Sequence, residues 1–260
     1  MPIPARCIPA GPAYRTNTTP YWRKPPSPIS VRAFSPKRDD RALGRRFPWR
    51  LLKEALFMVQ ALETLMHEHR LIEQVAGSLD TFVVNLERHA EADRQTVRDY
   101  ADFFRTFTDK CHHGKEEDRL FVLMNRFGFP KEFGPVAVMI AEHREGRDHI
   151  GVLASIGAGD GPLTDDERQA VIEHGGAYVP LIRAHIMKED NILYPMAEQA
   201  IPPEEMEKLA ADMELFERNE MGEGTHERYH ALAERLIEAY PPDASRMAEG
   251  AACVGCPGHM

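Results

Sequence analysis

Two parts of the chain carry the same pattern of side chains that bind metal ions. A Glu-His-Arg tripeptide occurs at residues 68–70 and again at residues 142–144, and each copy is followed by a His-x-x-x-Glu segment. Residues four apart lie on one face of a helix, so each histidine and glutamate pair can point towards one site. The candidate ligands are His69, His112 and Glu116 in the first part, and His143, His185 and Glu189 in the second. Four imidazoles and two carboxylates that converge from four helices predict a dinuclear metal centre.

The first His-x-x-x-Glu segment leaves two registers open. His113 and Glu117 have the same spacing as His112 and Glu116 and lie one position further along the chain. Alignment of the two copies places His112 opposite a histidine, but places His113 opposite Ile186, which cannot bind a metal. We therefore predict that His112 and Glu116 are ligands, and that His113 and Glu117 flank or surround the site.

The alternative to a metal site is a set of ordinary core histidines. His69 and His143 lie within apolar stripes and therefore point inward, where an imidazole must be hydrogen-bonded or bound to a metal. For one such residue a hydrogen-bonded core histidine is the better interpretation. The same ligand set in both halves of the chain favours a metal site instead.

The ligand types restrict the choice of metal. Imidazole and carboxylate ligands without a thiolate suit iron, with manganese or zinc less favoured. If both glutamates bridge, each of two iron ions receives two imidazole nitrogens and two carboxylate oxygens. Positions then remain open for water, an oxo bridge, O2, peroxide or NO.

The ligands must be positioned by helices. Between residues 50 and 240 the apolar residues follow helical spacing, and no strand-like alternation of any length occurs. We expect long helices up to about residue 89, at 94–127, at 133–156 and at 164–197, where Thr164 opens a capping box. Pro180 and Pro195 are expected to bend or end the fourth helix. The prediction is an all-α fold: an up-down-up-down four-helix bundle over 55–200 with one or two additional helices over 201–241 packed outside it. We expect a break at Gly222–Gly224 within this additional helical part.

The two ends of the chain differ in composition from this helical part. Residues 1–50 are rich in proline and arginine, and we expect them to be a disordered extension. The alternatives are a misassigned start, with the folded protein beginning near Met58, and a targeting segment. Residues 242–260 are expected to be a flexible tail in which Cys253 and Cys256 bind a metal, exchange electrons or remain inert.

Charge and composition exclude some classes of partner. The net charge is −9, and because residues 1–50 are basic, the helical part carries more negative charge still. Such a surface argues against nucleic acid as a partner. The sequence has no apolar run long enough to span a membrane, and its four cysteines do not form a disulfide framework, so we expect a cytoplasmic location.

Three other features are assigned no place in the site. The sequence from His226 to His230 matches the His-Glu-x-x-His pattern of zinc proteases, but we interpret it as an ordinary amphipathic helix because no third ligand follows. Arg105 and Tyr178 occupy equivalent positions in the two copies, and for them a core or surface role is favoured over contact with the site. Cys111 is interpreted as a buried packing residue.

The repeated motif resembles that of a known family. The pattern His-x-x-Lys-Glu-(Glu/Asp)-x-x-Leu-(Phe/Tyr) occurs twice and alternates with Glu-His on the partner helices, as in hemerythrin-like (HHE cation-binding) domains. The resemblance covers about residues 58–200. It implies a bundle that holds a non-haem di-iron centre, with the same six residues as iron ligands.

One departure from the family pattern bears on function. Hemerythrins that carry oxygen have a second histidine four residues after the one on the third helix, and here that position is Arg147. The four-histidine set is more similar to the bacterial branch linked to iron–sulfur cluster repair and to nitric oxide or peroxide stress. The resemblance therefore implies a di-iron oxidoreductase that acts on O2, peroxide or NO, in stress response or iron homeostasis. A non-enzymatic sensor of iron or oxygen is the alternative.

Overall fold

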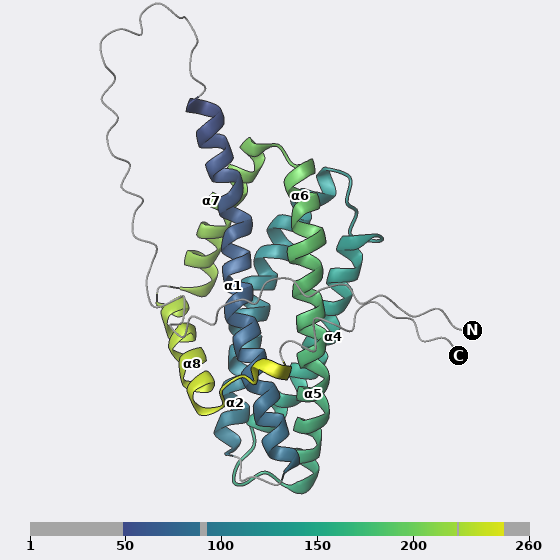
Figure 1. Cartoon of the computed structure of the whole chain (residues 1–260), viewed down its shortest axis with the longest axis vertical. Coiled ribbons are helices and arrows are strands. Elements are labelled where there is room, and N and C mark those ends of the chain that lie inside the picture. Colours follow the sequence, from purple (N-terminus) through teal and green to yellow (C-terminus); the bar gives the residue numbers. More distant parts are fainter. Residues whose placement is uncertain (1–48, 89–92, 223, 247–260) are drawn as a thin grey trace, which may run out of the picture. The chain divides into compact units, whose positions relative to one another are not determined.

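The computed structural model describes residues 49–88, 93–222 and 224–246, with side chains from residue 60 onward, and every regular element in these residues is a helix (Figure 1). The unit that contains these elements extends from Pro48 to Met260. The predictions for residues 1–48 and for Cys253 and Cys256 fall outside the described residues, and the predicted domain boundaries stay predictions. No helix in the described part is long and apolar enough to cross a membrane.

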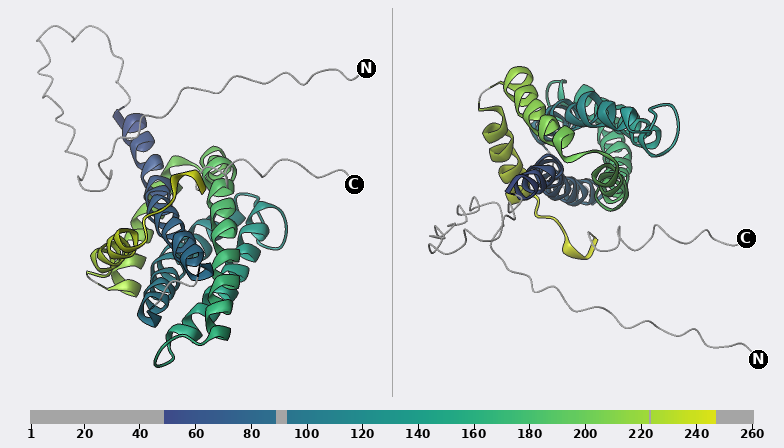
Figure 2. Two further views of the ribbon diagram at one scale, coloured as in Figure 1. Left: turned by 60° about the horizontal axis from the view of Figure 1, so that its bottom comes forward. Right: turned by 90° about the horizontal axis from the view of Figure 1, so that it is seen from above.

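Four long helices form the bundle, as predicted. The label η marks a π-helical segment, in which each backbone hydrogen bond joins residues five apart. The first helix is α1 (Trp49–Glu87); the second consists of α2 (Arg94–Asp102), η2 (Phe103–His113), η3 (Glu116–Leu120) and α3 (Phe121–Arg126); the third is α4 (Pro135–Gly157); and the fourth consists of α5 (Asp165–Lys188), η4 (Glu189–Leu193) and α6 (Tyr194–Ala200). Helix α5 packs against α1 and α4, and α2 packs against α4 (Figure 2). Short connections between successive helices give the up-down-up-down order.

Two more helices pack against the bundle, which confirms the expectation of additional C-terminal helices. Helix α7 (Pro203–Phe216) continues into η5 (Glu217–Met221) and packs against α1, and α8 (Thr225–Ala239) packs against α1 and η2. Gly222 and Gly224 separate them with φ angles of 83° and 76°, in the left-handed region that glycine adopts at little cost. The predicted break at these glycines is therefore observed.

The sequence signals at the ends of the fourth helix had different outcomes. Thr164 forms the predicted capping box with Glu167, and α5 starts directly after it. Neither Pro180 nor Pro195 ends the helix, so that part of the expectation is wrong. Helix α5 continues through Pro180, while Pro195 lies in the first turn of α6, where no intrahelical hydrogen bond needs its missing N–H.

The π-helical segments coincide with the predicted ligands. Segment η3 begins at Glu116 and η4 begins at Glu189, and η2 ends at His113. The hydrogen bonds of a π-helix make a wider turn than those of an α-helix, so successive side chains differ less in direction. As a result His112 and His113, which are adjacent in sequence, are both buried, with exposures of 1% and 4%.

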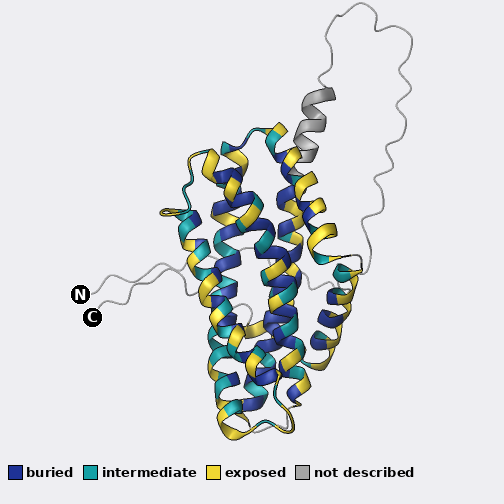
Figure 3. Cartoon of the chain, turned by 180° about the vertical axis from the view of Figure 1, so that it is seen from behind, coloured by how far each residue is buried: buried dark blue, intermediate teal, exposed yellow. Residues whose placement is uncertain are grey.

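The candidate ligands lie between two apolar clusters. Along α1, His69 separates Leu65, which belongs to one cluster, from Ile72, which belongs to the other. The ligands of the other three helices are flanked by the two clusters in the same way. Buried residues follow the inner sides of the helices over most of the length of the bundle (Figure 3). The metal-binding side chains therefore lie in a layer from which water is largely excluded.

Candidate metal centre

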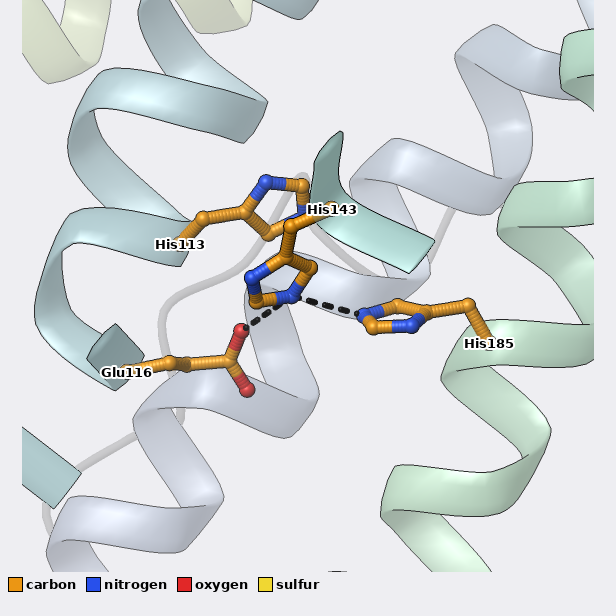
Figure 4. A group of neighbouring side chains, drawn as sticks. All are labelled: His113, Glu116, His143 and His185. Carbon is orange, nitrogen blue, oxygen red and sulfur yellow. Dashed lines mark hydrogen bonds and ion pairs between the residues drawn. The ribbon is translucent and has the colours of Figure 1, made fainter. Parts of the chain in front are cut away.

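The structure brings the four predicted histidines together as two pairs. The Nε2 atoms of His69 and His112 lie 2.9 Å apart, and those of His143 and His185 lie 3.0 Å apart (Figure 4). Two nitrogens bound at right angles to one metal, at about 2.1 Å each, have this separation. The two histidines of each pair come from one helical hairpin, and each pair defines one candidate metal position. We call the position between His69 and His112 the first position, and the position between His143 and His185 the second position.

Both predicted glutamates lie between the two pairs. Glu189 places Oε2 3.3 Å from His69 Nε2 and Oε1 3.2 Å from His185 Nε2. The Oε2 atom of Glu116 lies 3.4 Å from His143 Nε2 and 3.7 Å from His112 Nε2. Each carboxylate therefore contacts a histidine of both pairs. This is the arrangement that a carboxylate bridging two metal ions requires.

The outer nitrogen of every paired imidazole faces a carboxylate. The Nδ1 contacts are His69 with Asp190 (2.7 Å), His112 with Glu68 (2.9 Å), His143 with Glu117 (2.7 Å) and His185 with Glu142 (3.0 Å). A carboxylate accepts a hydrogen bond and cannot donate one, so it fixes the proton on Nδ1. The Nε2 atoms within each pair then face each other, and this arrangement requires either a shared proton or a metal ion between them.

Several polar atoms of the centre have no hydrogen bond. Glu116 Oε2 and both carboxylate oxygens of Glu189 are buried without a hydrogen-bonding partner among the described residues. A buried carboxylate is costly unless a cation lies beside it, and either a protonated neighbouring imidazole or a bound metal ion reduces this cost. The orphaned oxygens and the facing nitrogens border the same two positions, so the residues present fit two metal ions.

Two lysines complete the surrounding shell. Lys115 donates to Glu68, and Lys188 donates to Glu142, so the twofold pattern extends beyond the ligands. Burial raises the pKa of Glu68, but Lys115 and the bond to His112 outweigh it and hold the pKa at about 2. These lysines and acidic residues were not singled out from the sequence. The repeat could have indicated them, because both copies have a glutamate directly before the first histidine and a lysine directly before the glutamate ligand.

Tyr194 makes one metal position different from the other. Its hydroxyl donates to Glu116 Oε1 at 2.7 Å, and its ring stacks on His69 with the centroids 5.5 Å apart. The equivalent residue in the first copy is Phe121, which stacks on His143 but carries no hydroxyl. Burial raises the pKa of Tyr194 well above its ordinary value, so the phenol remains protonated as a hydrogen-bond donor.

His113 lies beside His143 and His185, close enough to be a ligand, whereas the sequence alignment placed it at the flank or in the surroundings of the site. Its ring stacks on His143 with the centroids 3.8 Å apart, and His113 groups with Glu116, His143 and His185, whose ligand atoms all lie within 4.8 Å of one another (Figure 4). Its Nε2 has no hydrogen-bonding partner among the described residues. Burial and the neighbouring histidines lower the pKa of His113 well below 6.5, so its ring is neutral. His113 is thus a seventh candidate ligand, which the sequence could not reveal because the wider turn of η2 directs it inward.

Arg147, which stands where oxygen carriers have a fifth imidazole, binds carboxylates instead. It donates to Glu117 Oε1 at 2.6 Å and to Asp109 Oδ1 at 2.7 Å. Glu117 also contacts His143 Nδ1, so Arg147 holds the carboxylate that orients this histidine. This residue acts on the centre through Glu117 and does not replace the missing ligand.

The other candidate clusters carry no metal site. Glu68, Cys111 and Glu217 approach one another, but the ammonium group of Lys115 already lies between these acidic residues. Burial raises the pKa of the Cys111 thiol to about 12, which agrees with its interpretation as a packing residue. His226 and His230 lie close together on α8 without a third ligand among the described residues.

Comparison with known proteins agrees with this four-helix metal-binding architecture. A family model, the hemerythrin HHE cation binding domain, matches residues 60–197. The chain belongs to this family, whose members bind metal cations, and the match contains all of the candidate ligands.

The chain is also similar to uncharacterized mycobacterial proteins. These include Mb2018 of Mycobacterium bovis and Rv1995 of Mycobacterium tuberculosis, each 21% identical over 165 residues. The matched region covers 64% of this chain and 64% of each relative, so the chain spans less than two thirds of their length. No solved structure matches the chain.

We expect protons and metal ions to compete for this centre. Burial lowers the pKa values of His69 and His185, but the surrounding carboxylates outweigh it and raise them to about 9 and about 10. The stabilisation from protonating these histidines in the metal-free protein is complete below about pH 6.5 and is lost as the pH rises through 9 to 10. A metal must displace these protons, so its affinity should rise about tenfold per pH unit for each proton released. Chelator competition at about pH 6 and pH 8 measures this change, and equal affinities would contradict it.

Proposed function

We propose that this protein holds a non-haem di-iron centre at which O2, peroxide or NO binds and reacts. The main support is the pair of facing Nε2 atoms at each of two positions, with Glu116 and Glu189 between them. The mixed imidazole and carboxylate set suits iron, which in such sites retains open coordination positions. The iron ions would supply the redox chemistry, and the protein would supply geometry and a dry environment.

The residues of the chain have distinct tasks in this proposal. The four outer carboxylates orient the imidazoles and increase their basicity. The Tyr194 hydroxyl is a fixed hydrogen-bond donor beside the first position, where it holds Glu116. The two apolar clusters keep water from the layer. We place this activity in the response to oxidative or nitrosative stress, or in iron homeostasis, in the cytoplasm.

Iron analysis of the full chain tests the proposal. Anaerobic loading with Fe(II), followed by removal of loose metal, should leave two iron ions per folded chain. Exposure to O2 should produce near-ultraviolet absorption from oxo-to-iron charge transfer, and NO or peroxide should change the spectrum. A folded protein that retains no iron after loading, or a loaded protein that responds to none of the three ligands, would overturn the proposal.

A further inference from the structure

A cavity of about 560 Å³ lies directly beside the second metal position. Segment η2 contributes Phe104, Arg105 and His113 to its wall, and α4 and α5 contribute the facing side. His113 also stacks on His143, so one imidazole separates the cavity from a candidate ligand. A molecule at the His113 end of this cavity is therefore adjacent to the centre.

The volume of the cavity indicates an organic ligand. Sites for small organic molecules have volumes of about 300–1,000 Å³, whereas one water molecule occupies about 30 Å³. A diatomic molecule or hydrogen peroxide would leave most of the 560 Å³ unfilled. The centre thus has room beside it for a molecule much larger than O2 or NO.

Two glycines on α4 keep the cavity open. A Cβ atom at Gly146 would lie 3.3 Å from the ring of Tyr178, and a Cβ at Gly151 would have nothing within 4 Å. Glycine lowers the stability of a helix by about 1 kcal/mol relative to alanine. The two glycines therefore weaken α4, but the absence of side chains leaves room for the cavity. Ala154 and Ala158 continue this wall of small residues.

The charges around the cavity favour a carboxylate ligand. Arg147 is already neutralised by Asp109 and Glu117. Arg105 is exposed, and among the described residues it has no hydrogen bond or ion pair. The rest of the wall is mixed: Phe104, Ile150 and the ring of Tyr178 are apolar, whereas Ser155 and the Asp109–Arg147 ion pair are polar. Apolar surfaces beside one unpaired guanidinium suit an anion with an apolar body.

We propose that the cavity binds an organic carboxylate, with its carboxylate at Arg105 and its apolar chain directed towards His113. Eight residues separate these two positions, which is at most about 12 Å along the helix axis. A chain of medium length, such as octanoate, spans that distance and a short one does not. The role of this ligand as a substrate or effector rests on the proposed di-iron function, whereas its binding does not.

Calorimetric titration of the iron-loaded full chain with octanoate tests the proposal. We expect saturable binding at one site, with the neutral octanamide weaker by about tenfold or more, because a hydrogen bond to a charged group contributes about 1.5–3 kcal/mol. Butyrate should also be weaker by about tenfold or more, because it lacks four CH2 groups whose burial contributes about 0.8 kcal/mol each. Arg105→Gln should weaken octanoate by a similar factor and leave octanamide unchanged. Octanamide binding as tightly as octanoate would overturn the assignment.

A cavity-filling variant supplies the steric control. Gly151→Phe places an aromatic ring in the cavity, and octanoate binding should be lost. The helix should tolerate this substitution, because a Cβ atom at residue 151 would have no other atom within 4 Å. Ala141→Phe adds the same bulk to an exposed position of α4 outside the cavity and should bind octanoate normally. Equal binding by both variants would refute the site. Iron analysis of the same samples separates this result from a failure of the di-iron proposal, since neither substitution touches a ligand.

Discussion

Replacing Glu189 with glutamine should weaken metal binding at both positions at once. Its two oxygens lie 3.3 Å from His69 Nε2 and 3.2 Å from His185 Nε2, so this one side chain contacts a histidine of each pair. Loss of an outer-shell residue typically costs 10–100-fold in metal affinity, and we expect loss of a bridging ligand to exceed about 100-fold. Equilibrium dialysis followed by metal analysis should show that both ions are lost together.

Two comparison variants make this prediction specific. His69→Ala removes a ligand of the first position only, so it should release one ion more readily than the other. Glu198→Gln makes the same chemical change at an exposed position of α6 and should retain both ions. If Glu189→Gln lost one ion and kept the other tightly, the carboxylate would not bridge.

Lys115→Met should be among the most destabilising substitutions in the protein. The Lys115 side chain is 1% exposed and donates to Glu68, whose side chain is 4% exposed. Removal of one member of a buried ion pair leaves an uncompensated charge and costs about 3–5 kcal/mol. Urea unfolding of the metal-free protein should show a loss of this size.

The repeat supplies a matched control for this substitution. Lys188 makes the equivalent bond to Glu142, but these side chains are 28% and 17% exposed. Water compensates part of the charge left there, so Lys188→Met should cost about 1 kcal/mol or less. The double variant Lys115→Met with Glu68→Gln should recover much of the lost stability, because it removes the stranded charge. Equal losses for the two lysine variants would show that burial does not determine the effect.

The sequence predicted the bundle and six of the centre's side chains for a clear physical reason. Helical periodicity and the repeated ligand spacing both depend on regular α-helix geometry, which holds for His69 and His143 on α1 and α4. The capping box at Thr164 and the break at Gly222 depend on local chemistry, so they too could be predicted.

The features that escaped prediction depend on departures from that geometry or on tertiary contacts. His113 faces the centre because η2 is π-helical, whereas alignment with Ile186 on a regular α-helix excluded it as a ligand. Pro195 does not end its helix because η4 changes the hydrogen bonding before it. The bond of Arg147 to Glu117 joins separate helices, and the cavity beside Gly146 and Gly151 exists only once those helices pack.

The position of the two glutamates would make a metal bound beside them a cross-link between the halves of the chain. Each helical hairpin supplies one imidazole pair and one carboxylate, and each carboxylate reaches a histidine of the other hairpin: Glu116 contacts His143, and Glu189 contacts His69. Neither hairpin alone holds a complete site. Docking of the two hairpins and binding of the metal are therefore thermodynamically coupled, and a bound metal would stabilise the closed bundle.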